Sequence, residues 1–243
     1  MNTIKKLCAA ALLLVMPAMA MASGAAVHLD QAPVNLNDKA SLQRGAKLFI
    51  TKCLACHSAA SMRYNRLKDL GLNDEQIKKD MELPEDVKLG STMQSAMDAG
   101  SAKLAFGVAP PDLSVISRSR SADWLYTYMR TFYEDTNRAS GWNNTTFPNV
   151  GMPFVLSDLQ GTQALEVEKH GEHEVKKLIM KTPGSMTAEQ YDAAVGDLVN
   201  YLVFMGEPAK LVRMQLGWIV LGFLAVLFVL VFALKKEIWR DLH

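Results

Sequence analysis

The sequence predicts a mainly α-helical, loop-rich domain that carries one transmembrane helix at its C-terminal end. Apolar residues recur at helical spacing in two segments, and no segment alternates convincingly enough to form the core of a sheet. Near the end of the chain, 21 consecutive residues carry no charge, which is long enough for a helix to cross a bilayer.

Residues 1–22 are predicted to be a signal peptide. Lys5 and Lys6 precede a short apolar run at 7–15, and small residues then offer a cleavage site after Ala22. A first transmembrane helix is the alternative, but its apolar run is too short to span a bilayer comfortably. Cleavage would leave two of the three cysteines in the mature chain.

The first amphipathic helix is expected just before the two remaining cysteines. Leu42, Ala46 and Phe49 follow helical spacing, and Gly45 lies on the same side. A glycine inside a helix costs about 1 kcal/mol relative to alanine. A close crossing with another helix would be a reason to keep it.

The second amphipathic helix is expected through residues 191–202, where apolar side chains follow the 3.6-residue period. Thr187 and Gln190 can form a capping box at its start, and Gly206 ends the pattern. Further helices are expected at about 74–82 and at Asp123–Tyr133. The segments 107–111 and 141–144 contain residues that do not continue helices and are expected to be loops.

The charge-free run Met214–Leu234 is predicted to be the membrane anchor, within a helix at 211–234. A buried core helix is the alternative, but such a helix rarely lacks charged residues for so long. The segment 23–210 would then be an exported, periplasmic domain, and 235–243 a short cytoplasmic tail that begins with two lysines.

Residues Cys53-Leu54-Ala55-Cys56-His57 match the C-x-x-C-H pattern for covalent attachment of haem c. Two thiols three residues apart at a helix start can reach both vinyl groups of one porphyrin. His57 then lies under the iron as its proximal ligand. A porphyrin held in this way would fill the centre of a loop-rich domain with apolar atoms.

Other uses of the cysteine pair fit the sequence less well. A zinc site would want two more Cys or His residues at partner spacing, and His28, His170 and His173 offer no convincing pair. A thioredoxin-like pair would want a βαβ context. A structural disulfide would not need His57.

The second axial ligand decides between an electron carrier and a haem enzyme, because His/Met ligation closes the iron whereas an open position suits O₂ or peroxide chemistry. Met152 is the candidate. Its loop is stiffened by Pro148 and Pro153, and Gly151 permits close backbone approach. Met186 is the second candidate, although an apolar residue there commonly packs against the start of a helix.

Three segments, Cys53–Leu67, Ala109–Ser114 (APPDLS) and Gly141–Leu156, together resemble the cytochrome c1 family. Members of this family are the haem c subunits of the ubiquinol–cytochrome c reductase (cytochrome bc) complex. The order of signal, single haem motif, late methionine loop and C-terminal anchor extends the resemblance to nearly the whole chain. The resemblance implies a cytochrome c-like fold of the bacterial type.

By this resemblance, Cys53 and Cys56 hold one haem c, and His57 and Met152 ligate its iron. Arg120, which follows the APPDLS block, would lie near the haem propionates. Arginine suits the pairing with carboxylates, and a solvated surface arginine is the alternative.

The implied role is one-electron transfer in the respiratory chain. The Rieske iron–sulfur protein would supply the electron, a cytochrome c or another periplasmic acceptor would take it, and the cytochrome b subunit would be a further partner. No bond is made at this subunit, so the chain would not be an enzyme alone. Its place would be the bacterial inner membrane, as a single-pass protein. The net charge of +1 argues against nucleic acid as a partner.

Two other functions remain open. A membrane-tethered cytochrome c that delivers electrons to a terminal oxidase would share the ligands but usually has a more compact haem domain. Here more than thirty residues separate Met152 from Thr187. A haem peroxidase or ligand sensor would need an exchangeable sixth position on the iron.

Acidic residues cluster at 74–86 and 166–174, and the second cluster lies in a charge-dense stretch that is expected to be solvated. Solvated surface is the usual role of such runs. The alternative is that one cluster steers a basic electron acceptor towards the haem.

Overall fold

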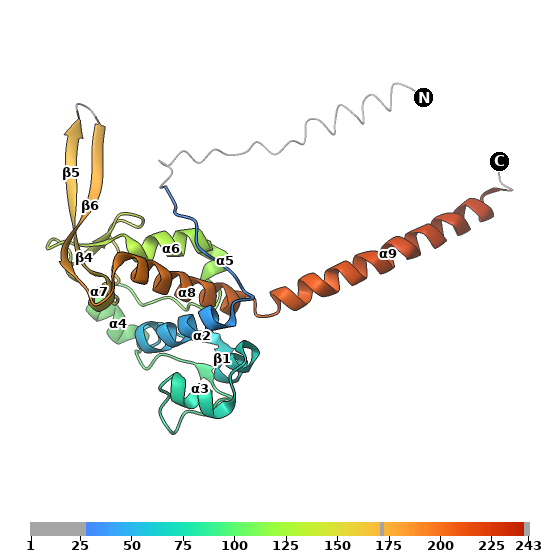
Figure 1. Cartoon of the computed structure of the whole chain (residues 1–243), viewed down its shortest axis with the longest axis horizontal. Helices are drawn as coiled ribbons and strands as arrows, with labels where there is room; N and C mark the ends of the chain where they lie inside the picture. Colours follow the sequence, from blue (N-terminus) through green and yellow to red (C-terminus); the bar gives the residue numbers. More distant parts are fainter. Residues whose placement is uncertain (1–27, 171–172, 241–243) are drawn as a thin grey trace.

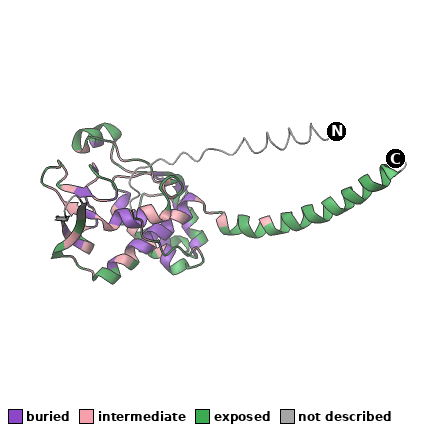
Figure 2. Cartoon of the chain, turned by 90° about the horizontal axis from the view of Figure 1, so that it is seen from above, coloured by how far each residue is buried: buried purple, intermediate pink, exposed green. Residues whose placement is uncertain are grey.

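The computed structural model of the chain describes residues 28–170 and 173–240. The predicted signal peptide and its cleavage site lie outside the described residues. The fold is mainly helical, as predicted, and its buried residues gather where helices α2 (Lys39–Leu48) and α8 (Ala188–Gly206) lie side by side (Figures 1 and 2). Helix α9 (Lys210–Ile238) extends away from this domain.

Helix α2 begins at a side-chain cap and buries the predicted face. The Asp38 carboxylate accepts a hydrogen bond from the backbone N–H of Ser41 at 3.0 Å, which satisfies one of the free donors at the helix start. Leu42, Ala46 and Phe49 are almost fully buried. The spacing of apolar residues therefore predicted both the helix and its inner face.

The crossing of α2 and α8 is close enough to require a glycine. A Cβ placed on Gly45 would lie 2.0 Å from the carbonyl oxygen of Asp197 and 2.8 Å from Cβ of Tyr201. The rings of Phe49 and Tyr201 meet at the same crossing, with centroids 5.7 Å apart. The expected close helix crossing at Gly45 is confirmed.

Helix α8 has the predicted capping box. The Thr187 hydroxyl accepts from the Gln190 backbone N–H, and the Gln190 side chain accepts from the Thr187 N–H at 3.0 Å. Further along the helix, the side chain of the fully buried Asn200 binds the backbone N–H of Asn35 at 3.0 Å and its carbonyl at 2.9 Å. This amide ties the segment before α2 to α8.

The predicted helix at 74–82 is present as α3 (Asp74–Asp80), whereas the one expected at Asp123–Tyr133 is shorter. Helix α6 (Ala122–Arg130) stops early because strand β3 (Phe132–Glu134) follows it and pairs with β4 (Trp142–Asn144). Strand β4 lies in the segment 141–144, which the sequence predicts to be a loop. The remaining elements before residue 161 are η1 (Phe49–Cys53), β1 (Ala59–Arg63), η2 (Tyr64–Leu70), β2 (Thr92–Met93), α4 (Ala99–Phe106), α5 (Ile116–Arg120) and α7 (Ser157–Gln160).

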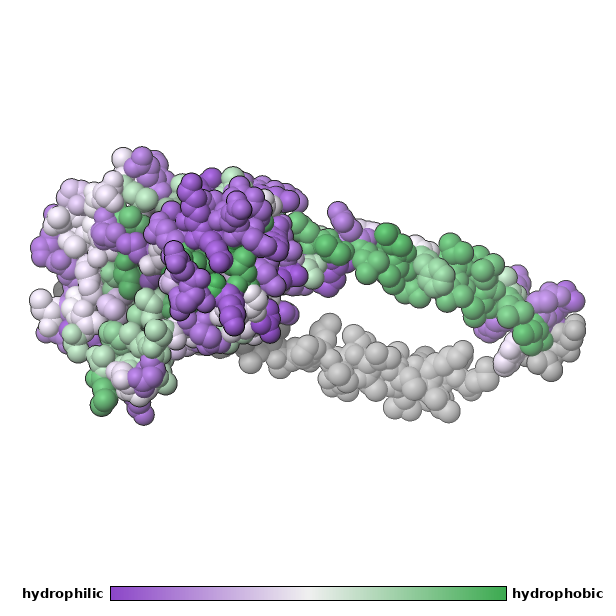
Figure 3. Space-filling view, turned by 90° about the horizontal axis from the view of Figure 1, so that it is seen from below, coloured by the Kyte–Doolittle hydropathy of each residue, from purple (hydrophilic) through white to green (hydrophobic). Residues whose placement is uncertain are grey.

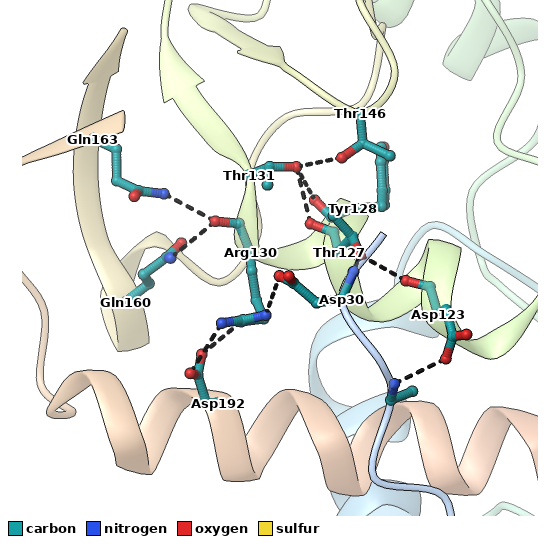
Figure 4. Close-up of polar contacts among 11 residues, drawn as sticks. Asp30, Asp123, Thr127, Tyr128, Arg130, Thr131, Thr146, Gln160, Gln163 and Asp192 are labelled. Atoms are coloured by element: carbon teal, nitrogen blue, oxygen red, sulfur yellow. Dashed lines mark hydrogen bonds and ion pairs between the residues drawn. The ribbon is translucent and has the colours of Figure 1, made fainter. Parts of the chain in front are cut away.

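A partly buried arginine at the end of α6 joins this helix to α8 and to the N-terminal segment (Figure 4). The Arg130 guanidinium, whose side chain is 22% exposed, binds Asp192 of α8 through two nitrogens at 2.6 and 3.0 Å. It also binds Asp30 at 2.7 Å. Paired Arg–carboxylate contacts are stronger than neutral hydrogen bonds. Arg130 therefore fixes α6, α8 and the N-terminal segment relative to one another.

An antiparallel hairpin, β5 (Gly161–His170) and β6 (His173–Pro183), projects from the domain (Figure 1). The sequence reading expected a solvated stretch here and missed the strands, although the charged residues at 166–168 and 176–177 are indeed exposed. Glu166 lies opposite Lys177 and Val167 opposite Lys176. Because lysines face this part of the acidic cluster, it is a weaker candidate for steering a basic acceptor than its sequence suggests.

Helix α9 is mostly apolar through Met214–Leu234 and carries charged residues at both ends, and none of its residues is buried in the described part of the chain (Figures 2 and 3). Its 29 residues give a length of about 43 Å, more than the hydrocarbon core of a bilayer. The buried core helix that was the alternative is therefore excluded. The helix begins one residue before the predicted anchor and ends four residues after it.

Candidate functional site

The C-x-x-C-H motif lies at the end of a helix, where the sequence reading expected a helix start. Helix α2 continues into one π-helical turn, η1 (Phe49–Cys53), and the chain then turns sharply. The backbone N–H groups of Cys56 and His57 both donate to the Cys53 carbonyl, at 3.1 and 2.8 Å. A π turn holds one residue more than an α turn and so changes the direction in which the following residues leave the helix.

Both cysteines, His57 and Met152 line one small, partly open cavity of about 70 Å³. Three segments far apart in the sequence meet there, and the walls are almost entirely apolar. The other lining residues are Lys52, Phe106, Val108, Pro110, Pro111, Gly151, Pro153 and Val155.

The Cys53 thiol is poorly suited to thiolate chemistry. In the described chain Cys53 and Cys56 form no disulfide. Burial raises the pKa of Cys53 to about 12, with the nearby Cys56 adding to the shift. Zinc binding and disulfide exchange both use the thiolate. A site that keeps Cys53 protonated therefore favours neither of those alternatives.

His57 is held with one ring nitrogen aimed at a carbonyl. Its Nδ1 lies 2.8 Å from the carbonyl oxygen of Pro111. Because a carbonyl only accepts, Nδ1 carries the proton and Nε2 keeps its lone pair. Burial lowers the pKa of His57, which favours the neutral ring. A neutral imidazole with an unprotonated Nε2 is the form that binds a metal.

The APPDLS block places the Pro111 carbonyl beside His57. The Asp112 carboxylate accepts from the Ala60 N–H at 2.8 Å, and the Ser114 hydroxyl accepts from the Ser61 N–H at 3.0 Å. These bonds attach the block to the segment that directly follows the motif. The APPDLS block is a family signature in the sequence, and its structural role depends on partners outside the block.

Two asparagines hold the methionine loop. Asn144 is fully buried, and its side chain accepts from the Thr146 N–H at 2.8 Å and donates to the Tyr128 carbonyl at 2.8 Å. The Asn143 side chain accepts from the Asn149 N–H at 2.8 Å. The sequence reading credited the prolines with the rigidity of this loop. The side-chain amides contribute hydrogen bonds that it missed.

Gly151 and Met152 close one side of the cavity. A Cβ on Gly151 would lie 3.0 Å from both the Phe106 carbonyl oxygen and a Val108 methyl group, which agrees with the expected close backbone approach. Met152 is half-buried, and its Sδ lies 3.4 Å from the Tyr128 hydroxyl. Met186, the second candidate, packs against the core and is not among the lining residues of the cavity.

Arg120 lies on the surface beside the methionine loop. Its guanidinium lies over the ring of Trp124, 5.1 Å from the centroid, and over that of Phe147 at 5.6 Å. Such cation–π contacts orient an arginine. Arg120 is not among the residues that line the cavity, so its contact with haem propionates stays a prediction.

Comparisons with known proteins identify the cytochrome c1 family. The model of the cytochrome C1 family matches residues 30–242. Over 231 residues the chain is 50% identical to a Nitrosomonas europaea protein named ammonia monooxygenase gamma subunit, covering 95% of this chain and 96% of that one. Over 244 residues it is 45% identical to cytochrome c1 of Allochromatium vinosum, covering 98% and 100%. A protein of Bradyrhizobium diazoefficiens named cytochrome b/c1 is 24% identical over 258 residues, which are 87% of this chain and 34% of that one.

Proposed function

We propose that this chain, which belongs to the cytochrome c1 family, passes single electrons through a ubiquinol–cytochrome c reductase complex. The family carries a covalently bound haem c, and haem c is accordingly the cofactor of this chain. The chain is an electron-transport protein whose apolar helix α9 fits membrane anchoring. As an electron carrier it makes and breaks no substrate bond, and the enzyme is the whole complex.

Cys53 and Cys56 would hold the haem through thioether bonds, and the Nε2 of His57 and the Sδ of Met152 would ligate its iron. The observation that carries this assignment is the Nδ1 contact of His57 with Pro111, because it leaves Nε2 unprotonated in the wall of the cavity. Bound haem c supplies a one-electron carrier. If His57 and Met152 both bind the iron, they would leave no place on it for water or O₂, which favours electron transfer over the peroxidase or sensor alternative.

The Rieske iron–sulfur protein is the proposed donor, and a cytochrome c or another periplasmic protein the proposed acceptor. Val108 lines the cavity and is 55% exposed, so the cavity wall reaches the surface there. A partner can therefore approach the bound group without opening the fold. Arg120 is proposed to pair with a propionate at the haem edge. A propionate that is paired with an arginine costs less free energy to bury than an unpaired one.

The haem domain is proposed to lie on the periplasmic side of the inner membrane. The signal-like N-terminus would export residues 23–210, and Lys235 and Lys236 at the far end of α9 fit the excess of positive charge on the cytoplasmic side. The proposed domain limits are therefore 1–22, 23–210, 211–234 and 235–243.

The cytochrome b subunit is the proposed membrane partner. A relative whose name joins cytochrome b and c1 in one chain supports this pairing. The name of the Nitrosomonas europaea relative points instead to a monooxygenase assembly. Met152 and His57 line one cavity, so together they could ligate the iron and leave no open position on it. A haem of this kind carries electrons, which suits the reductase.

Affinity purification of the full chain from detergent-solubilised membranes tests the proposal. We expect haem c to co-purify with b haems, seen in reduced-minus-oxidised spectra, and with a Rieske cluster, seen by electron paramagnetic resonance. Isolation with monooxygenase subunits, or with neither b haem nor an iron–sulfur cluster, would refute the assembly. A tethered cytochrome c would give the second of these results.

A further inference from the structure

The proposed iron ligand has a buried hydrogen-bond donor of its own. The Tyr128 hydroxyl lies 3.4 Å from the Met152 sulfur, a hydrogen-bonding distance for a sulfur acceptor. A phenol is protonated at neutral pH, and a thioether has no proton to give. The direction of the bond is therefore fixed, with Tyr128 as donor and Met152 as acceptor.

The ring of Tyr128 is fixed in place on two sides. It stacks on Trp124 with centroids 4.8 Å apart and an interplanar angle of 11°, and Phe132 packs edge-on at 4.9 Å. Tyr128 is only 8% exposed, so little water competes for its hydroxyl. A buried donor without a partner is costly, which favours a maintained contact with the sulfur.

The donor and the acceptor are also held to each other through the backbone. The Asn144 side chain donates to the carbonyl of Tyr128 at 2.8 Å and accepts from the N–H groups that begin the methionine loop. The same buried amide therefore positions α6, which carries Tyr128, and the loop, which carries Met152. A fixed distance between hydroxyl and sulfur follows from this arrangement.

We propose that Tyr128 is a positioning residue for the haem iron, whose hydroxyl hydrogen-bonds the Met152 sulfur and raises the reduction potential. The inference rests on the proposed function, since it takes Met152 as the ligand. A thioether sulfur has two lone pairs, so one can bind iron while the other accepts the hydroxyl. The bond draws electron density from the sulfur, which then stabilises the ferric ion less. Hydrogen bonds to metal ligands tune the metal in this way.

The test is Tyr128→Phe in the full membrane-bound chain with its haem attached. Phenylalanine keeps the ring and its stacking on Trp124 and removes only the hydroxyl. We expect the ferrous-to-ferric ratio at a fixed applied potential to fall by about two- to tenfold, the range expected for one hydrogen bond. The Met–iron charge-transfer band should persist with a shifted maximum.

Tyr126→Phe is the matched control, because Tyr126 lies on the same helix and packs under Arg130 with the guanidinium 4.5 Å from its ring centroid. Its redox titration should match that of the unaltered chain. An unchanged ratio in Tyr128→Phe, or an equal fall in both variants, would overturn the role of Tyr128 while leaving Met152 as the ligand. If the band survives in Met152→Leu, Met152 is not the ligand, and both the ligation and this inference fail.

Discussion

Met152→Leu is expected to keep its covalent haem and to lose the Met–iron charge-transfer band. The proposed attachment through Cys53 and Cys56 is left in place by the substitution, and leucine nearly matches the volume of methionine. Without the thioether, the ferric ion loses the ligand that raises the potential. The potential should fall by more than about 60 mV, which is a tenfold change for a one-electron couple.

Met186→Leu is the matched control for this experiment. Met186 packs half-buried against the core, away from the lining of the cavity, so its replacement should leave the band and the potential unchanged. Loss of the band in Met186→Leu, with its persistence in Met152→Leu, would reverse the assignment. Binding of CO to the reduced Met152→Leu protein, but not to the unaltered one, would show that the substitution opens the position on the iron that Met152 is proposed to fill.

Gly45→Ala is expected to destabilise the haem domain by about 3 kcal/mol or more, at the upper end of the cost of overpacking a core. The new methyl group would lie 2.0 Å from the Asp197 carbonyl oxygen and 2.6 Å from its carbon. Both are backbone atoms, so α2 and α8 must separate. For a domain of this size the midpoint of thermal unfolding should fall by roughly 6–12 °C.

Circular dichroism at helical wavelengths measures this shift, and Gly90→Ala is the control. A Cβ on Gly90 meets nothing within 4 Å, so the midpoint of that variant should stay close to that of the unaltered protein. Equal midpoints for Gly45→Ala and Gly90→Ala would mean that the helices are not in close contact. That result would contradict the crossing on which the fold depends.

Features that depend on local spacing were predictable from the sequence. The inner face of α2, the capping box of α8 and the apolar anchor are all set by residues within a few positions of one another. Gly45 was informative because a glycine inside a helix is costly, and a close helix crossing is a reason to keep one there. The C-x-x-C-H spacing likewise identified one wall of the cavity.

Features that depend on distant partners were not predictable. Residues 166–168 and 176–177 of the β5–β6 hairpin are all exposed, so these parts of its strands lack the clear alternation that marks a half-buried strand. The roles of Asn144 and Tyr128 arise only when α6 meets the methionine loop. The helix-end position of the motif depends on the π turn that ends at Cys53, for which the sequence carries no signal.

The most direct test of the central claim is the reduction of haem c by a ubiquinol analogue in the purified complex, followed optically in a stopped-flow instrument. We predict that haem c of this chain is reduced within the turnover time of the complex, and that it stays oxidised when the Rieske cluster has been removed. Reduction of co-purified b haems while haem c stays oxidised in the intact complex would contradict the account.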